Sequence, residues 1–170
     1  MEFNKEIEII LKDCRSVAIE LGSDHLSSYH YILGLLKTDN FPNRIFKNKK
    51  WKFIELSKSM MKMEKKNCET YFLTKEFEKA LKNAKYYSWI YNLDEVKSEH
   101  IILALLSDKK SYAGEYLTSI GMNYSDFKTE YEKIEKQKAN KFLEMIANNT
   151  FTMKLKIPNL IYNLFKKNAG

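Results

Sequence analysis

The 170-residue chain is poor in the residues that interrupt helices and in those that cross-link small domains. It has five glycines and two prolines, which suits long helices joined by short turns and argues against a sandwich of many strands. Cys14 and Cys68 are its two cysteines, too few for a disulfide framework and without the spacing of a metal site. Reduced thiols in a cytoplasm are therefore expected.

Long hydrophobic runs are also missing. No stretch holds the roughly 18 uncharged apolar residues that a membrane span needs, and the charged N-terminal segment 1–12 lacks the apolar region of a signal peptide. Hydrophobic residues make up 44% and charged residues 30%, as in ordinary soluble proteins. We therefore expect a cytoplasmic protein without membrane contact, built as one domain or as two small halves that share a core.

The formal charge of +7 is unevenly distributed. Residues 47–66 carry eight lysines against Glu55 and Glu64, and four more lysines lie at positions 154–167. A basic strip of this kind attracts nucleic acid or acidic proteins. It lacks the arginines and interleaved aromatic residues of a base-reading surface, so a solvated helix face is the favoured interpretation. A basic helical nucleic-acid-binding protein remains the alternative function.

The main signal is an internal repeat. A shift of 70 positions aligns residues 3–36 with residues 73–106 without a gap, and 12 of these 34 positions are identical, where random pairing gives about two or three. The identical pairs include Glu6 with Glu76, Ser28 with Ser98 and His30 with His100. The chain therefore contains two copies of one structural unit.

Each copy has the pattern of four helices. Apolar residues recur at three- and four-residue steps over residues 4–21 and again over the equivalent stretch from Thr74, which predicts one amphipathic helix per copy. Asn4 and Thr74 are predicted to cap these helices, and Gly22 and Asn92 to end them in the left-handed conformation. Ser28 and Ser98 are predicted to cap a second, central helix that is apolar almost all round. Further helices are expected at about 41–48, 52–66, 110–120 and 125–148.

This pattern resembles the Clp N-terminal repeat domain of the ClpA and ClpC chaperones. The family signature of the second helix, Thr-Glu-His-[Ile/Leu]-Leu-x-[Gly/Ala]-Leu, is matched closely by residues 98–106, Ser-Glu-His-Ile-Ile-Leu-Ala-Leu-Leu. Residues 28–36, Ser-Tyr-His-Tyr-Ile-Leu-Gly-Leu-Leu, match it except that Tyr29 replaces the glutamate. The resemblance covers residues 3 to about 135 and implies an all-α, pseudo-two-fold bundle of about eight helices.

The expected organisation is a double repeat domain over residues 1–148, with repeats at 3–66 and 73–148. A C-terminal extension follows at 149–170, in which residues 159–167 are compatible with a final short helix. Because no Gly-x-x-x-x-Gly-Lys-[Ser/Thr] nucleotide loop occurs, ATP hydrolysis in the Clp manner is not expected. The chain is either the N-terminal part of a longer protein or a free-standing regulator or adaptor.

The resemblance implies a non-catalytic module that recruits substrates or adaptor proteins for an ATP-dependent unfoldase or protease. Its implied partners are a Clp-type ATPase, an adaptor or a client peptide, and neither a cofactor nor a metal is expected. The implied binding residues are Ser28, Tyr29, Ser98 and Glu99. In ClpC-like relatives two signature glutamates bind phosphoarginine, and only Glu99 matches one here. An acidic residue in the first turn of a helix also has a simple structural explanation, since it stabilises the positive end of the helix dipole.

His30 and His100 are expected to be packed structural residues, because no Cys, His or Asp cluster lies near either of them in the sequence. The aromatic residues Tyr86, Tyr87, Trp89 and Tyr91 exceed what one buried stripe needs. Such a surplus favours a protein- or peptide-binding surface where the two copies meet.

Overall fold

The computed structural model describes residues 2–47, 50–60 and 70–153. The chain divides into two units, Met1–Lys128 and Thr129–Gly170, which are described separately. The described residues form eight helices and four two-residue strands, so the predicted all-α class is confirmed. Within these residues no helix combines the length and apolarity needed to cross a membrane.

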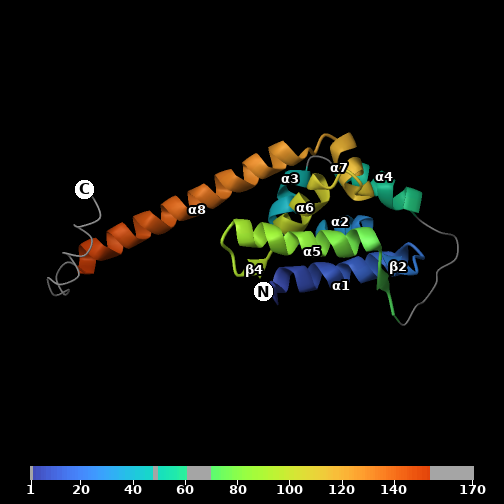
Figure 1. Cartoon of the computed structure of the whole chain (residues 1–170), viewed down its shortest axis with the longest axis horizontal. Helices are drawn as coiled ribbons and strands as arrows, with labels where there is room; N and C mark the ends of the chain where they lie inside the picture. Colours follow the sequence, from blue (N-terminus) through green and yellow to red (C-terminus); the bar gives the residue numbers. More distant parts are fainter. Residues whose placement is uncertain (1, 48–49, 61–69, 154–170) are drawn as a thin grey trace. The chain divides into compact units, whose positions relative to one another are not determined.

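The order of elements repeats along the chain (Figure 1). The first copy contains β1 (Glu2–Phe3), α1 (Lys5–Glu20), β2 (His25–Leu26), α2 (Ser28–Leu35), α3 (Phe41–Phe46) and α4 (Lys50–Met60). The second contains β3 (Phe72–Leu73), α5 (Lys75–Ile90), β4 (Glu95–Val96), α6 (Ser98–Ser107), α7 (Tyr112–Ser119) and α8 (Tyr124–Met153). The last residues of the predicted helix 52–66, and the whole predicted helix 159–167, lie outside the described residues.

The predicted starts and stops of the first helices are confirmed. The side chain of Asn4 accepts from the backbone N–H of Ile7 at 3.1 Å, and Thr74 accepts from the N–H of Phe77 at 3.3 Å. Gly22 has φ 70° and Asn92 has φ 52°. Both stops therefore use the left-handed conformation that glycine and asparagine tolerate best.

The predicted caps of the central helices are wrong by one residue. The N-cap positions are Ser27 and Lys97, and Ser28 and Ser98 occupy the first helical turn. Their hydroxyls do not cap their own helices but donate to carboxylates of the other repeat, Glu76 and Glu6 respectively. A tertiary hydrogen bond to a charged acceptor has displaced the local one.

The strands join the two copies reciprocally. Parallel pairing places Glu2–Phe3 beside Glu95–Val96, and His25–Leu26 beside Phe72–Leu73. The strand before the first helix of each copy thus pairs with the strand before the second helix of the other copy. This exchange continues in backbone bonds from Asn4 N–H to the carbonyl of Val96 and from Thr74 N–H to that of Leu26.

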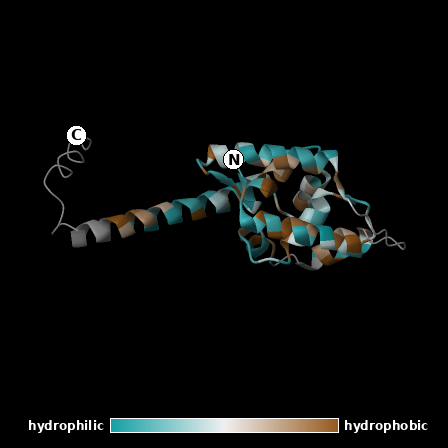
Figure 2. Cartoon of the chain, turned by 90° about the horizontal axis from the view of Figure 1, so that it is seen from below, coloured by the Kyte–Doolittle hydropathy of each residue, from teal (hydrophilic) through white to brown (hydrophobic). Residues whose placement is uncertain are grey.

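The core is built around α2 and α6, which lie among the other helices of the first unit (Figure 1). All but one residue of α2, and residues 98–105 of α6, are buried. Gly34 permits a close approach of α2 to α1, because a Cβ there would lie 2.7 Å from the backbone nitrogen of Cys14. The surrounding helices alternate hydrophilic and hydrophobic stretches, as expected for amphipathic helices that cover a core (Figure 2).

The described part of the second unit is the remainder of α8, through Met153. Four of its large apolar side chains are exposed, those of Phe142, Leu143, Met145 and Ile146. The predicted boundary between residues 148 and 149 falls inside this helix.

Candidate functional site

Two serine–glutamate contacts join the repeats and position the candidate residues. Ser28 Oγ donates to Glu76 Oε2 at 2.7 Å, and Ser98 Oγ donates to Glu6 Oε1 at 2.5 Å. These four residues are two repeat-related pairs, so one interaction is made twice across the pseudo-two-fold axis. Glu76 also accepts from Ser111 Oγ at 2.6 Å through its other oxygen. Each central helix therefore begins against the first helix of the other copy.

The repeated histidines hold the starts of the central helices. His30 Nδ1 accepts from the backbone N–H of Ser27 at 3.0 Å, and His100 Nδ1 accepts from that of Lys97 at 3.0 Å. His30 is 2% exposed and His100 is fully buried. Both side chains play the part that glutamate or glutamine usually plays in a capping box. The structural role predicted for them is confirmed.

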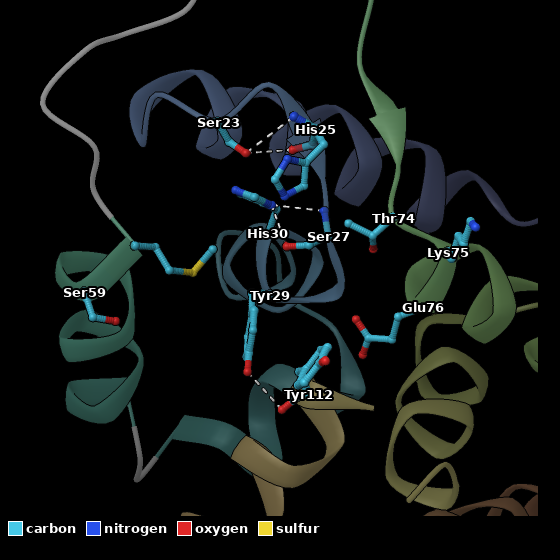
Figure 3. Close-up of a pocket in the computed structure, with 11 residues that line it drawn as sticks. Ser23, His25, Ser27, Tyr29, His30, Ser59, Thr74, Lys75, Glu76 and Tyr112 are labelled. Carbon is cyan, nitrogen blue, oxygen red and sulfur yellow. Dashed lines mark hydrogen bonds between the residues drawn. The ribbon is translucent and has the colours of Figure 1, made fainter. Parts of the chain in front are cut away.

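A cavity of about 690 Å³ opens at the start of α2 (Figure 3). Its walls come from the segment before α2, the start of α2 itself, the end of α4 and the starts of α5 and α7. The side chains that argue for binding are Tyr29, Glu76 and Tyr112, with Lys75 beside Glu76 on the same helix. The cavity therefore combines two phenol rings with one carboxylate, at a place where both repeats contribute.

Tyr29 is held rather than free in this cavity. Its hydroxyl donates to the backbone carbonyl of Tyr112 at 3.0 Å, and its ring makes an edge contact with Tyr116. Burial, together with the negative charges of Glu76 and Glu115, raises the pKa of Tyr29. The phenol thus stays neutral at physiological pH and fixes one wall of the cavity.

Glu99 occupies the matching position in the second copy but is not displayed to solvent. It is 6% exposed, and burial raises the pKa of its carboxyl group, with the charge of Glu6 acting in the same direction. Its Oε2 lies 3.1 Å from Ser98 Oγ, the same hydroxyl that donates to Glu6. The carboxyl group is turned into the contact between the repeats, which the first-turn helix-dipole interpretation did not anticipate.

A serine–histidine contact also lines the cavity, but its geometry is that of a cap. Ser27 Oγ lies 2.8 Å from His30 Nδ1, the nitrogen that already accepts the backbone N–H of Ser27. A nucleophile would need this nitrogen available as its base. Among the described residues no group of three or more His, Cys, Asp or Glu side chains is arranged to hold a metal ion.

The four residues selected from the sequence fall at two repeat-related places. Tyr29 lines the cavity in the first copy, whereas its counterpart Glu99 is buried in the second, and Ser28 and Ser98 are both fully buried. Sequence reasoning missed Glu76 and Tyr112 as neighbours of Tyr29. The identity of Glu6 and Glu76 between the copies was the available signal for the first, but no pattern in the sequence pointed to Tyr112.

The cysteines give no reactive centre among the described residues. Cys14 is fully buried, and burial raises the pKa of its thiol to about 12. The hypothesis of an exposed Cys68 falls outside the described residues. Of the surplus aromatic residues, Tyr86 and Trp89 are exposed, while the ring of Tyr91 stacks on His100.

A duplicated helical bundle with exchanged strands and reciprocal serine–glutamate contacts defines a two-repeat, all-helical module. The sequence matches the family model of the Clp repeat (R) N-terminal domain over residues 2–120 and 72–155, and the chain belongs to this family. This domain is a non-catalytic part of Clp ATPases. Among proteins of curated function, none matches the sequence significantly.

Solved structures share the fold at low sequence identity. The N-terminal domain of Hsp104 from Candida albicans matches with a TM-score of 0.64 and 17% identity, covering 79% of this chain and 92% of that one. The N-terminal domain of the chaperone ClpD from Arabidopsis thaliana gives 0.58 and 16%, covering 79% and 94%. The N-terminal domain of the ClpV1 ATPase from E. coli gives 0.58 and 14%, covering 75% and 82%. At these identities the likeness establishes the fold.

Proposed function

We propose that this chain is a non-catalytic protein-interaction module that recruits substrates or adaptor proteins to a Clp-type ATP-dependent unfoldase in the cytoplasm. The observation that carries the proposal is the cavity at the start of α2, because two repeats meet there around aromatic and acidic side chains. Protein interfaces are enriched in tyrosine, and a concave site allows a bound side chain to be desolvated. Family membership supports the same function.

Within this function, Tyr29, Glu76 and Tyr112 are proposed to contact the bound segment, with Ser28 holding Glu76 in place. Tyr29 changes the chemistry at the position of the family glutamate, since a neutral phenol offers a ring face and a hydroxyl but no second carboxylate. The bound segment is therefore expected to differ from one that two carboxylates recognise. Ser98 and Glu99 are proposed to act as structural partners rather than as an equivalent second site.

The test is a chimaera in which residues 1–153 replace the N-terminal domain of a Clp ATPase that requires this domain to degrade an unfolded client. Degradation of the client should be restored by the unaltered chain and reduced by Tyr29→Ala. The matched control is Ile9→Ala, which removes an exposed apolar side chain of α1 that does not line the cavity. A chimaera no more active than the ATPase without an N-terminal domain would contradict the proposal.

The nucleic-acid alternative is tested on the same purified chain. Counterion release makes such binding fall steeply with salt. Steeply salt-dependent binding to a random-sequence oligonucleotide, together with an inactive chimaera, would favour that alternative.

A further inference from the structure

A second, smaller pocket lies in the first repeat between α1, α2 and α4. Its volume is about 350 Å³, at the lower end of the roughly 300–1,000 Å³ range of small-ligand pockets. Its lining is mostly apolar: Val17, Leu21, Leu33, Leu36, Phe53 and Ile54. Of these, Ile54 is 56% exposed and stands at the rim. The pocket shares no lining residue with the cavity around Tyr29.

The second repeat carries aromatic residues at two of the equivalent positions. The 70-residue shift puts Tyr87 at the position of Val17 and Tyr91 at that of Leu21, while Leu33 remains a leucine, Leu103. Aromatic rings thus stand in the second copy where the first has smaller aliphatic side chains.

The ring of Tyr87 is half-buried beside Tyr124 at the start of α8. The Tyr87 ring lies 6.4 Å from that of Tyr124, and its hydroxyl donates to Tyr124 Oη at 3.3 Å. Burial raises the pKa of Tyr87 to about 12, and Ser107 and Lys128 are among the groups that act on it. Ser107 is the repeat counterpart of Lys37, which lines the pocket in the first copy. At the position of Tyr87 in the second repeat, the first repeat therefore has the smaller side chain of Val17 and no ring.

The flank of the pocket is basic. A neighbouring depression of about 320 Å³ shares Leu36 and Lys37 with the pocket and adds Arg44, Lys47 and Asp39. Glu20 lines the pocket itself and pairs with Lys37 at 3.2 Å. The Arg44–Asp39 pair is long, at 3.9 Å, and both side chains are mostly exposed. The two linings together hold the cations Lys37, Arg44 and Lys47 against the carboxylates Glu20 and Asp39. The arrangement offers a hydrophobic recess beside a surface with a small excess of positive charge.

We propose that this pocket binds an aromatic side chain of an acidic protein segment. The ring would occupy the place that Tyr87 takes in the second repeat, and the acidic residues beside it would lie over Arg44 and Lys47. The acidic character of the partner is inferred from the cations beside the pocket, and the aromatic side chain is inferred from the tyrosines at the equivalent positions of the second repeat. The proposal extends the proposed function, since it gives an interaction module a second docking surface on different helices.

The test uses a fluorescein-labelled acidic peptide with one central tryptophan, and measures its binding to the full chain by fluorescence anisotropy. Val17→Tyr copies the residue of the second repeat into the first and should weaken binding about tenfold or more, because the new ring fills the pocket. Ile9→Tyr adds the same ring at an exposed position on α1 and should leave binding unchanged. Circular dichroism shows whether each variant is folded.

Two further comparisons separate the parts of the proposal. Replacing the tryptophan of the peptide by alanine should abolish binding, and the double variant Arg44→Glu, Lys47→Glu should weaken it severalfold and flatten its salt dependence. Equal binding by Val17→Tyr and the unaltered chain, or no binding by the latter, would overturn the proposal. Tyr29→Ala should not affect this peptide. An inactive chimaera with intact peptide binding would therefore contradict only the proposed function, and the converse result only this docking surface.

Discussion

The carboxylate of Glu76 is predicted to be the strongest single polar connection between the repeats. It accepts from Ser28 Oγ at 2.7 Å and from Ser111 Oγ at 2.6 Å, one hydroxyl to each oxygen. A hydrogen bond to a charged group contributes about 1.5–3 kcal/mol. Both serines are buried, so Glu76→Ala leaves two hydroxyls without their acceptor. Because Glu76 itself faces a cavity that water can enter, we expect the lower part of the summed range, a loss of about 3–4 kcal/mol.

The assay is urea unfolding followed by far-UV circular dichroism, with Glu78→Ala as the matched control on the same helix. Glu78 is exposed and pairs only with Lys82 one turn away, so its removal should change the midpoint little. In double-mutant cycles, Ser111→Ala should cost less in a Glu76→Ala background than alone. The cost that remains is the lost cap of α7, where Ser111 Oγ accepts from the backbone N–H of Gly114 at 3.0 Å. Similar midpoints for Glu76→Ala and Glu78→Ala, or additive effects with Ser111→Ala, would refute the idea that this carboxylate joins the repeats.

Three further predictions concern buried groups. The pKa of Glu99 is raised above its unfolded value, so ionisation of this carboxyl group opposes folding as the pH rises through the folded pKa. The gain in unfolding free energy from Glu99→Gln should therefore be larger at pH 7 than at pH 4. A gain in urea titrations that does not depend on pH would contradict this. In a Cys68→Ser background, Cys14 should react with a maleimide only as fast as the chain unfolds, since its thiol is buried and its pKa is about 12; rapid labelling of the folded chain, followed by mass spectrometry, would show otherwise. His100→Ala should destabilise the chain by about 2–4 kcal/mol, through a lost cap and a new cavity. His100→Gln retains an acceptor for the backbone N–H of Lys97 and should destabilise the chain less in thermal unfolding. Equal losses for the two variants would argue against the capping role.

The fold could be predicted from the sequence because local signals agreed with the global arrangement. Helix stops at Gly22 and Asn92 depend on backbone conformation, which the residue type itself determines, and the repeat doubled every signal. The strand exchange could not be predicted. Strands of two residues carry no periodicity, and Phe72–Leu73 becomes a strand only because His25–Leu26 lies beside it.

The site could be predicted only in part, because its contacts connect distant positions. Ser28 was recognised as important, but its preference as a cap led to the wrong partner. Its hydroxyl instead reaches Glu76, 48 positions away, where a charged acceptor makes the stronger bond. Tyr29 meets Tyr112 through a backbone carbonyl, and such a contact depends on where α7 begins rather than on residue type. Tertiary geometry therefore decided what local propensity could not.

The differences between the two copies are informative because their shared contacts are retained. The serine–glutamate bonds, the histidine caps and the exchanged strands occur in both repeats, so the scaffold places equivalent residues in equivalent surroundings. The two copies differ at two places that matter for binding. Tyr29, beside the cavity, corresponds to Glu99 of the second copy, and Val17, beside the smaller pocket, corresponds to Tyr87. Both positions border concave space in the first copy, whereas in the second copy Glu99 is buried and Tyr87 is half-buried. If folding alone determined these residues, exchanging them between the copies would alter stability and nothing else. We expect instead that Val17→Tyr weakens peptide binding about tenfold or more while the chain stays folded, and that the first repeat carries the binding chemistry.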